Sequence, residues 1–322
     1  MTVPTRLDTE LVRRGLARSR QRAADLIAAG RVQVDGSVAT KPAQQVPPGA
    51  ELHVLGTDRT EYVSRAAHKL VGALDAVESM VPGVLQVHGS RCLDAGASTG
   101  GFTQVLLERG ASHVVAVDVG HGQIAPQIAS DPRVTSLEGV NVRGLTPGQI
   151  GGTVDLVVAD LSFISLVVAL PALLGATDPH SHLLVMVKPQ FEVGRERLGS
   201  SGVVSSPALR EEAVTEVARA AYRLGAVASA VMPSPLPGPS GNHEYFLWLR
   251  PRAQATGAGA EADGPALGDA TTKDLRTAVL AAVREGRPSL VTPQVPEPEH
   301  AGPPAPPEPI PAPGHHDERR RR

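Results

Sequence analysis

Apolar residues between positions 64 and 250 alternate between two patterns along the chain. Short runs such as TVDLVVA and HLLVMV have the length and β-branched content of buried strands. The stretches between them carry apolar residues three and four positions apart, which indicates helices. Strands that alternate with helices predict βαβ units and a mostly parallel sheet. We therefore expect an α/β domain in this part of the chain.

The segment before this domain has a different pattern. A short helical pattern ends at Gly15, and a second helix is expected between Ser19 and Gly30. Asp35-Gly36 then lies between alternating valines, which is a strong hairpin signal. Two short helices and a hairpin predict a small α+β domain over residues 1–56, followed by a linker at 57–63.

The composition changes again after Pro251, to Ala, Gly, Pro and Glu. A helical pattern over 272–285 predicts a last helix for the α/β domain, which we place at 64–286 with a loop at 253–270. Residues 287–322 contain too few apolar side chains to bury a core and are expected to form a disordered, proline-rich tail.

Charge is distributed unevenly along the chain. The formal net charge is −2, but the first 31 residues hold seven arginines and three acidic residues, a net charge of +4. A basic module at the start of an acidic chain points to an anionic partner. The single cysteine, Cys92, excludes a disulfide framework and a cysteine-based metal cluster. No signal peptide or spanning segment is evident, so we expect a soluble, cytoplasmic protein, with a monomer as the default.

The most informative motif is RCLDAGASTGGFTQVLLERGASHVVAVDV. It predicts a strand that ends at Asp94, a turn with Gly96 and Gly100, a helix, and a second strand that ends at Asp118. Glycines let the backbone approach a ligand, and an acid after the second strand can hydrogen-bond a ribose diol. Ser98 stands where a dinucleotide fingerprint has glycine, and a P-loop Gly-Lys-Ser/Thr is absent. S-adenosylmethionine, with a ribose but no pyrophosphate, fits this loop.

Four polar residues occur where elements of the domain begin or end. Asp160 and Lys188 each follow a buried strand, Glu244 opens a third, and Lys69 lies on a helix that Ser64 can cap. Ligands of open parallel sheets bind beyond the carboxyl ends of the strands, so Asp160 and Lys188 should converge beside the cofactor. The expected cofactor contacts are Asp94, Gly96, Ser98, Gly100, Asp118, Asn141 and Asp160, although a turn role for Asn141 is an equal alternative.

The first module resembles an S4 domain, the small RNA-binding unit of ribosomal protein S4 and of many RNA-modifying enzymes. The resemblance is carried by RLDTELVRRGLARSRQRAADLIAAGRVQVDG. Such domains bind structured RNA through cations on phosphates, and the chain is only 2% aromatic, which disfavours base stacking as the binding mode. The resemblance implies RNA contacts from Arg6, Arg14, Arg18, Arg20, Arg22 and Lys41.

The motifs DAGASTGGFT, DLSFISL, KPQFE and GPSGNHEY, together with SRAAHKL, are similar to the TlyA family of rRNA methyltransferases, also called hemolysin A. Their catalytic domain is related to FtsJ-type ribose methyltransferases. The resemblance implies a Rossmann-like class I fold with a mostly parallel seven-stranded sheet, S-adenosylmethionine as cofactor and cytidine in ribosomal RNA as substrate. Ala66-Ala67 replace the Gly-Gly of many relatives, which affects the expected backbone at the start of the helix that carries Lys69.

The same resemblance assigns a Lys-Asp-Lys-Glu catalytic tetrad to Lys69, Asp160, Lys188 and Glu244. Methyl transfer is an in-line displacement, and a ribose 2′-hydroxyl must lose its proton as it attacks. Lys188 is the candidate base, since burial and a second cation at Lys69 both favour a neutral amine. Asp160 and Glu244 would orient the two lysines, and their charges oppose this effect.

Other activities fit the residues less well. Amine methylation typically uses Asn/Asp-Pro-Pro-Tyr/Phe where this chain has Asp-Leu-Ser-Phe, and Cys92 is placed as a core thiol, before the glycine turn, rather than as a nucleophile. No second ligand accompanies His121, so a metal site is not expected. Three alternatives remain: an inactive RNA-binding or ribosome-assembly protein, a membrane-active hemolysin, and an S4-bearing pseudouridine synthase.

Overall fold

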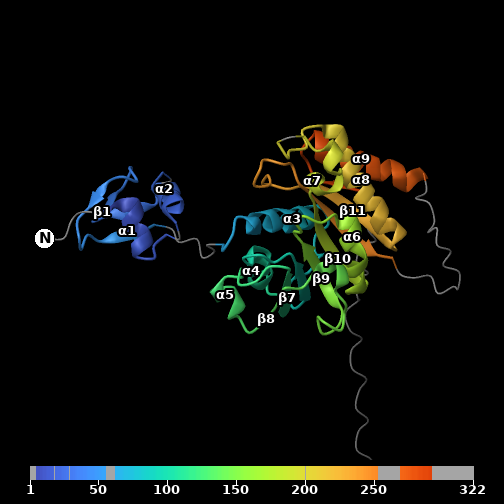
Figure 1. The fold of residues 1–322 in the computed structure, drawn as a ribbon, viewed down its shortest axis with the longest axis horizontal. Helices are drawn as coiled ribbons and strands as arrows, with labels where there is room; N and C mark the ends of the chain where they lie inside the picture. Colours follow the sequence, from blue (N-terminus) through green and yellow to red (C-terminus); the bar gives the residue numbers. More distant parts are fainter. Residues whose placement is uncertain are drawn as a thin grey trace, which may run out of the picture. The chain divides into compact units, whose positions relative to one another are not determined.

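The computed structural model divides the chain into two compact units, Met1–Val63 and Ser64–Arg322 (Figure 1). The structure describes residues 5–17, 19–28, 30–55, 62–199, 201–252 and 269–291. Within these residues, no helix is both long and apolar enough to cross a membrane.

The first unit is a small α+β domain, as expected from its sequence. The helices α1 and α2 pack on each other over a core that includes Leu7, Leu11 and Ile27. The turn between β2 and β3 has positive φ angles at Asp35 (48°) and Gly36 (80°), which two-residue hairpin turns require. Its elements are β1 (Thr5–Arg6), α1 (Leu7–Arg13), α2 (Arg20–Ala28), β2 (Val32–Val34), β3 (Ser37–Val38), β4 (Gln45–Val46) and β5 (Leu52–Val54).

The second unit is built on an eight-stranded sheet in the order β13-β11-β12-β10-β9-β6-β7-β8. The strands from β10 to β8 run parallel, and β12 is antiparallel to β10. The strands are β6 (Arg91–Ala95), β7 (His113–Asp118), β8 (Val134–Glu138), β9 (Val154–Ala159), β10 (Thr177–Val187), β11 (Ala226–Pro233), β12 (Tyr245–Pro251) and β13 (Ser289–Leu290). The Rossmann-like fold is confirmed, with one short edge strand more than the seven expected.

Helices pack on both faces of this sheet, and side chains alternate between the faces along each strand. One core joins the sheet to α6, α8 and α9, which lie side by side in Figure 1, while α3 and α4 contact each other away from that core. The helices are α3 (Ala66–Met80), α4 (Gly101–Glu108), α5 (Pro126–Ala129), α6 (Leu166–Gly175), α7 (Pro189–Glu192), α8 (Pro207–Arg223) and α9 (Asp269–Arg284), with 3-10 turns η1 (Val142–Gly144) and η2 (Arg195–Arg197).

The carboxyl end of the folded chain differs from the sequence-based expectation. The helix α9 begins at Asp269, inside the loop expected at 253–270, and the fold continues beyond Gly286. Ser289–Leu290 pair with β11, and the Val291 amide donates to the Ser229 carbonyl at 2.9 Å. Since α9 returns the chain beside the open edge of β11, a further strand satisfies backbone groups there. Residues 253–268 and 292–322 lie outside the described part.

The topology brings polar side chains from distant parts of the chain to one edge of the sheet. Asp118 is the last residue of β7, and Asp160 and Lys188 directly follow β9 and β10. Because β12 is antiparallel to its neighbour, Glu244, just before it, lies at the same edge. The sheet thereby collects side chains that are 126 positions apart in sequence, between 118 and 244, at one site.

Matched truncations test the contribution of β13. A chain that ends at residue 286 loses the buried Val291 side chain and the β11–β13 pairing. We expect this to cost about 2 kcal/mol and to lower the melting temperature by roughly 4–8 °C. A chain that ends at residue 295 should melt like the full-length protein in differential scanning calorimetry. Equal melting temperatures for the two truncations would contradict a stabilising role for β13.

Candidate active site

The glycine turn between β6 and α4 forms the floor of the site. Gly96 adopts φ +86°, and a Cβ at this position would lie 2.7 Å from the Asp160 backbone oxygen, so a side chain is excluded. Gly100 adopts φ +90° directly before α4. The amides of Gly96 and Ala97 both donate to the Val117 carbonyl, at 2.8 and 3.1 Å, which ties the turn to the end of β7.

Asp118 organises the loops on both sides of a cavity of about 530 Å³. Its carboxylate accepts hydrogen bonds from the Ser98 amide at 2.8 Å and from the Gly120 amide at 2.7 Å. Each carboxylate oxygen can accept a further bond, so the same group can still bind a ribose diol. The cavity is lined by Gly96, Ser98, Val117, Asp118, Val119, Gly120, Gln123, Val140, Asn141, Val142, Asp160, Leu161, Ser162, Phe163 and Ile164. A carboxylate beside apolar walls suits the ribose and adenine of S-adenosylmethionine.

The structure places the other expected cofactor residues differently. Asn141 has the turn role that was considered for it, since its side chain accepts the Arg143 amide at 3.0 Å, and it also lines this cavity. Asp94 is fully buried beneath the turn, does not line the cavity, and accepts the Thr103 hydroxyl at 2.7 Å. Burial raises the pKa of Asp94 to about 7. In this structure Asp94 supports the β6–α4 turn from below, and Gly100 shapes the start of α4.

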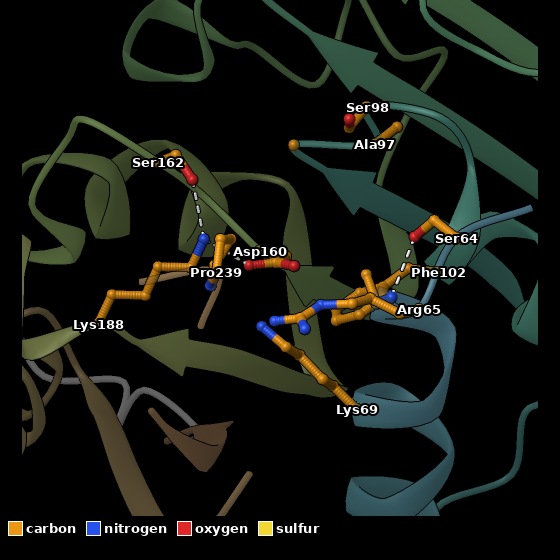
Figure 2. A pocket seen from close by; sticks show the side chains of 13 residues that line it. Ser64, Arg65, Lys69, Ala97, Ser98, Phe102, Asp160, Ser162, Lys188 and Pro239 are labelled. Carbon is orange, nitrogen blue, oxygen red and sulfur yellow. Dashed lines mark hydrogen bonds and ion pairs between the residues drawn. The ribbon is translucent and has the colours of Figure 1, made fainter. Parts of the chain in front are cut away.

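A second cavity of about 260 Å³ adjoins the first and shares Gly96, Ser98, Asp160 and Ser162 with it. Lys69 enters this second cavity from α3, and Lys188 enters it from the end of β10 (Figure 2). The helix α3 begins at Ala66, whose amide donates to the Ser64 hydroxyl at 3.0 Å. Two reactants, one bound in each cavity, would therefore meet beside the residues that both cavities share.

The four residues of the expected tetrad form two ion pairs. Lys188 lies 2.7 Å from Asp160 and donates to the Ser162 hydroxyl at 2.8 Å. Lys69 lies 2.5 Å from Glu244, which is buried behind it, and Gln190 donates to the same carboxylate at 3.4 Å. Both lysines are at most 9% exposed, and ammonium groups this deeply buried require such partners.

Two further cavity residues did not follow from the sequence pattern. Phe163 is 92% exposed, has φ +65°, and stands with its ring centroid 5.4 Å from that of Phe191. A bulky residue with positive φ is strained, and such strain concentrates at functional sites. Arg65 lines the cavity of Lys69 and donates to the Pro237 carbonyl at 2.7 Å. Neither the backbone strain at Phe163 nor the direction of the Arg65 side chain is visible in the sequence pattern.

A half-buried glutamate connects the chain segments that follow Asp160 and Lys188. Glu192 of α7 accepts the Ser165 hydroxyl at 2.6 Å and the Leu166 amide at 2.8 Å, at the start of α6. Burial raises the pKa of Glu192. These hydrogen bonds connect the segment after Lys188 to the segment after Asp160. The positions of Lys188 and Asp160 therefore depend on each other.

The cysteine is confirmed as a core residue. Cys92 is buried in β6, and burial raises the pKa of its thiol to about 12. The nucleophile of the reaction must therefore come from the substrate or from another residue.

The residues expected to contact RNA differ in exposure and in their partners. Arg6 and Arg20 are half to mostly exposed, and both pair with Asp8. Arg14 turns inward, toward Glu10 at 2.6 Å and the Ala50 carbonyl at 2.6 Å. The Lys41 side chain is exposed, Arg18 lies outside the described residues, and the Arg22 side chain is not described.

Comparisons with known proteins agree with both units. The FtsJ-like methyltransferase family matches residues 62–251, and the S4 domain family matches residues 5–52. The chain is 59% identical over 245 residues to the 16S/23S rRNA (cytidine-2′-O)-methyltransferase TlyA of Mycobacterium tuberculosis, which covers 76% of this chain and 89% of that protein.

Two more relatives extend the comparison. Hemolysin A of Brachyspira hyodysenteriae is 33% identical over 242 residues, covering 75% of this chain and 98% of that protein. A solved structure from Streptococcus thermophilus, assigned as a hemolysin, is 32% identical with a TM-score of 0.61 and covers 89% of this chain and 98% of its own.

Replacement of Asp118 tests the assignment of the larger cavity. Asp118→Ala removes the acceptor for a ribose diol and for two loop amides, so we expect the dissociation constant of S-adenosylmethionine to rise about tenfold or more. Calorimetric titration measures this without turnover. Asp131→Ala, which removes a surface carboxylate paired with Arg133, is the control and should leave the affinity unchanged. An unaltered affinity in Asp118→Ala would contradict the assignment.

Burial of Asp94 predicts a pH dependence of stability. Its folded-state pKa of about 7 lies above the unfolded value of about 3.9, so the folded protein binds the extra proton between these pH values. The free energy of unfolding must then fall as the pH rises from about 4 to 7, and Asp94 causes no further loss above that range. Asp94→Asn has no carboxyl group to ionise at this position. The free energy of unfolding of the variant, relative to that of wild type, should therefore rise from pH 5 to pH 8. Parallel urea-unfolding profiles for the two proteins would contradict the raised pKa.

Proposed function

The chain belongs to the FtsJ-like methyltransferase family and, within it, to the TlyA rRNA methyltransferases, and on this basis we propose the reaction and the residues that perform it. The protein is an S-adenosylmethionine-dependent methyltransferase. We propose that it methylates a ribose 2′-oxygen of ribosomal RNA, with cytidine as the target nucleoside, and that the tetrad Lys69, Asp160, Lys188 and Glu244 supports this reaction. An enzyme of ribosomal RNA is expected in the cytoplasm.

The observation that carries this proposal is the border between the two cavities. Asp160 and Ser162 line both of them, and Lys188 contacts both residues. When bound, the cofactor supplies a methyl group on a positively charged sulfur. The chain must then hold the acceptor oxygen in line with that methyl group and accept its proton. The residues at the border are the groups in position to do so.

Lys188 is the proposed acceptor of the 2′-hydroxyl proton. The Lys188 amine donates to the Ser162 hydroxyl at 2.8 Å and lies 2.7 Å from the Asp160 carboxylate, which leaves a third direction around the nitrogen. The third can face a hydroxyl in the smaller cavity. The ribose oxygen would displace the cofactor's sulfur as it bonds to the methyl carbon, its proton would pass to the Lys188 amine, and Asp160 would stabilise the ammonium that results.

Lys69 has a different role in the proposal. Its ammonium is held by the buried Glu244 and reaches the same cavity from another element. A fixed cation there stabilises the negative charge that develops on the attacking oxygen. Glu244 acts through Lys69, as a positioning residue, and Gly238 leaves room for its carboxylate.

Alternative functions have less support. The buried Cys92 does not suit methylation at a pyrimidine carbon. A purely RNA-binding protein would not need two lysine–carboxylate pairs beside a cofactor cavity, since burying such charges is costly. The hemolysin name of two relatives describes those proteins, and our proposal rests instead on the methyltransferase site.

A lysine series tests the proposal. Lys188→Ala should lower kcat for methylation of unmodified ribosomal subunits by about 10²–10⁴-fold, because the proton acceptor is lost. Lys188→Arg should not restore it, because arginine stays protonated. Both variants should bind S-adenosylmethionine within about twofold of wild type by calorimetry. Incorporation of labelled methyl groups measures the rate. Retained activity in Lys188→Arg would contradict the role of Lys188 as the base.

A further inference from the structure

One buried carboxylate in the first unit holds two arginines together. Asp8, in the first turn of α1, is 4% exposed. It accepts Arg6 through two parallel bonds, at 3.1 and 2.8 Å, and Arg20 through one bond at 3.1 Å. The terminal nitrogens of both guanidinium groups contact the same oxygen, Oδ2. These arginines come from different elements, β1 and the start of α2.

The shared Asp8 oxygen holds the two guanidinium groups close together. Two guanidinium groups repel each other and would separate if their side chains were free. Asp8 offsets this repulsion and fixes both groups beside one point. The Arg6 side chain remains 43% exposed and the Arg20 side chain 61% exposed, so each has N–H groups left for an outside partner. The cluster carries a net charge of +1.

We propose that Asp8 is a positioning residue that makes Arg6 and Arg20 a single clamp for one RNA phosphate. This inference rests on the proposed function, which gives the first unit an RNA partner. A phosphate group accepts bidentate and multiple N–H bonds from arginine, and a rigid donor set loses little entropy on binding. Asp8 therefore favours binding of an anion although it is itself an anion.

A second acid in the same helix provides an internal comparison. Glu10 is 5% exposed and also holds two arginines, Arg13 and Arg14. There, however, Arg14 donates to the Ala50 carbonyl and is only 25% exposed. That cluster connects α1 to the strand region of the unit. The pair held by Asp8 is the one that presents both guanidinium groups outward.

The direction of the effect of Asp8→Asn distinguishes this role from simple charge. The change adds one positive charge to a basic surface, so general electrostatics predicts tighter RNA binding. The clamp predicts the opposite, a loss of about tenfold in affinity for unmodified ribosomal subunits. The control is Glu216→Gln, which also removes an acid paired with an arginine, Arg223, on α8. Filter binding of the full-length variants measures both. Binding by Asp8→Asn as tight as wild type would overturn the proposal.

Two arginine variants keep the test valid if Asp8→Asn unfolds the first unit. Arg6→Gln and Arg20→Gln should each weaken binding about tenfold and lower the salt slope by the equivalent of about one phosphate. Because the two arginines share one phosphate, the double variant should be little weaker than either single variant. Fully additive losses of affinity, with the salt slope of the double variant lowered by about two phosphates, would overturn the clamp.

The same assay separates this inference from the proposed function. Wild-type protein that methylates ribosomal RNA but shows additive arginine losses would overturn the clamp alone. Wild-type protein that neither binds nor methylates either ribosomal subunit would overturn the proposed function together with the clamp.

Discussion

The cost of burying a charged ammonium group organises this active site. Lys69 and Lys188 both lie almost out of contact with solvent, and each is held by a carboxylate within 2.7 Å. Such a pair is stable only where the fold fixes both partners. The sheet does this, because β9 and β10 end side by side and the antiparallel β12 begins at the same edge. The reversed strand is thus what supplies Glu244, the buried carboxylate that pairs with Lys69.

The same constraint connects the floor of the site to its walls. Gly96 must be a glycine because the Asp160 backbone passes directly over it, and Asp118 holds the turn by its amides. The segment after Asp160 is in turn held by Glu192, in the short helix α7 that directly follows Lys188. The two cavities and the two lysine–carboxylate pairs therefore form one connected structure. In the first unit, the buried Asp8 carboxylate likewise holds charged side chains in place, here the exposed Arg6 and Arg20.

Sequence patterns predicted the parts of the fold that depend on local chemistry. The Asp35-Gly36 hairpin, the β6–α4 glycine turn and the strand ends at Asp118 and Asp160 follow from turn residues and apolar runs, and the structure confirms them. The four catalytic candidates came from family resemblance, and their pairing came only from the structure, since no sequence pattern reveals which lysine meets which acid. The burial of Asp94, the strained Phe163 and the strand β13 depend on tertiary packing, which periodicity alone does not encode.

The central claim is that the paired lysines act on a ribose oxygen. The most direct measurement is the chemistry of the methylated product. Ribosomal RNA labelled by this enzyme would be hydrolysed in alkali, which cleaves only next to a free 2′-hydroxyl. Our account predicts that the label remains in alkali-resistant dinucleotides. Label recovered in single nucleotides would place the methyl group on a base and contradict the account.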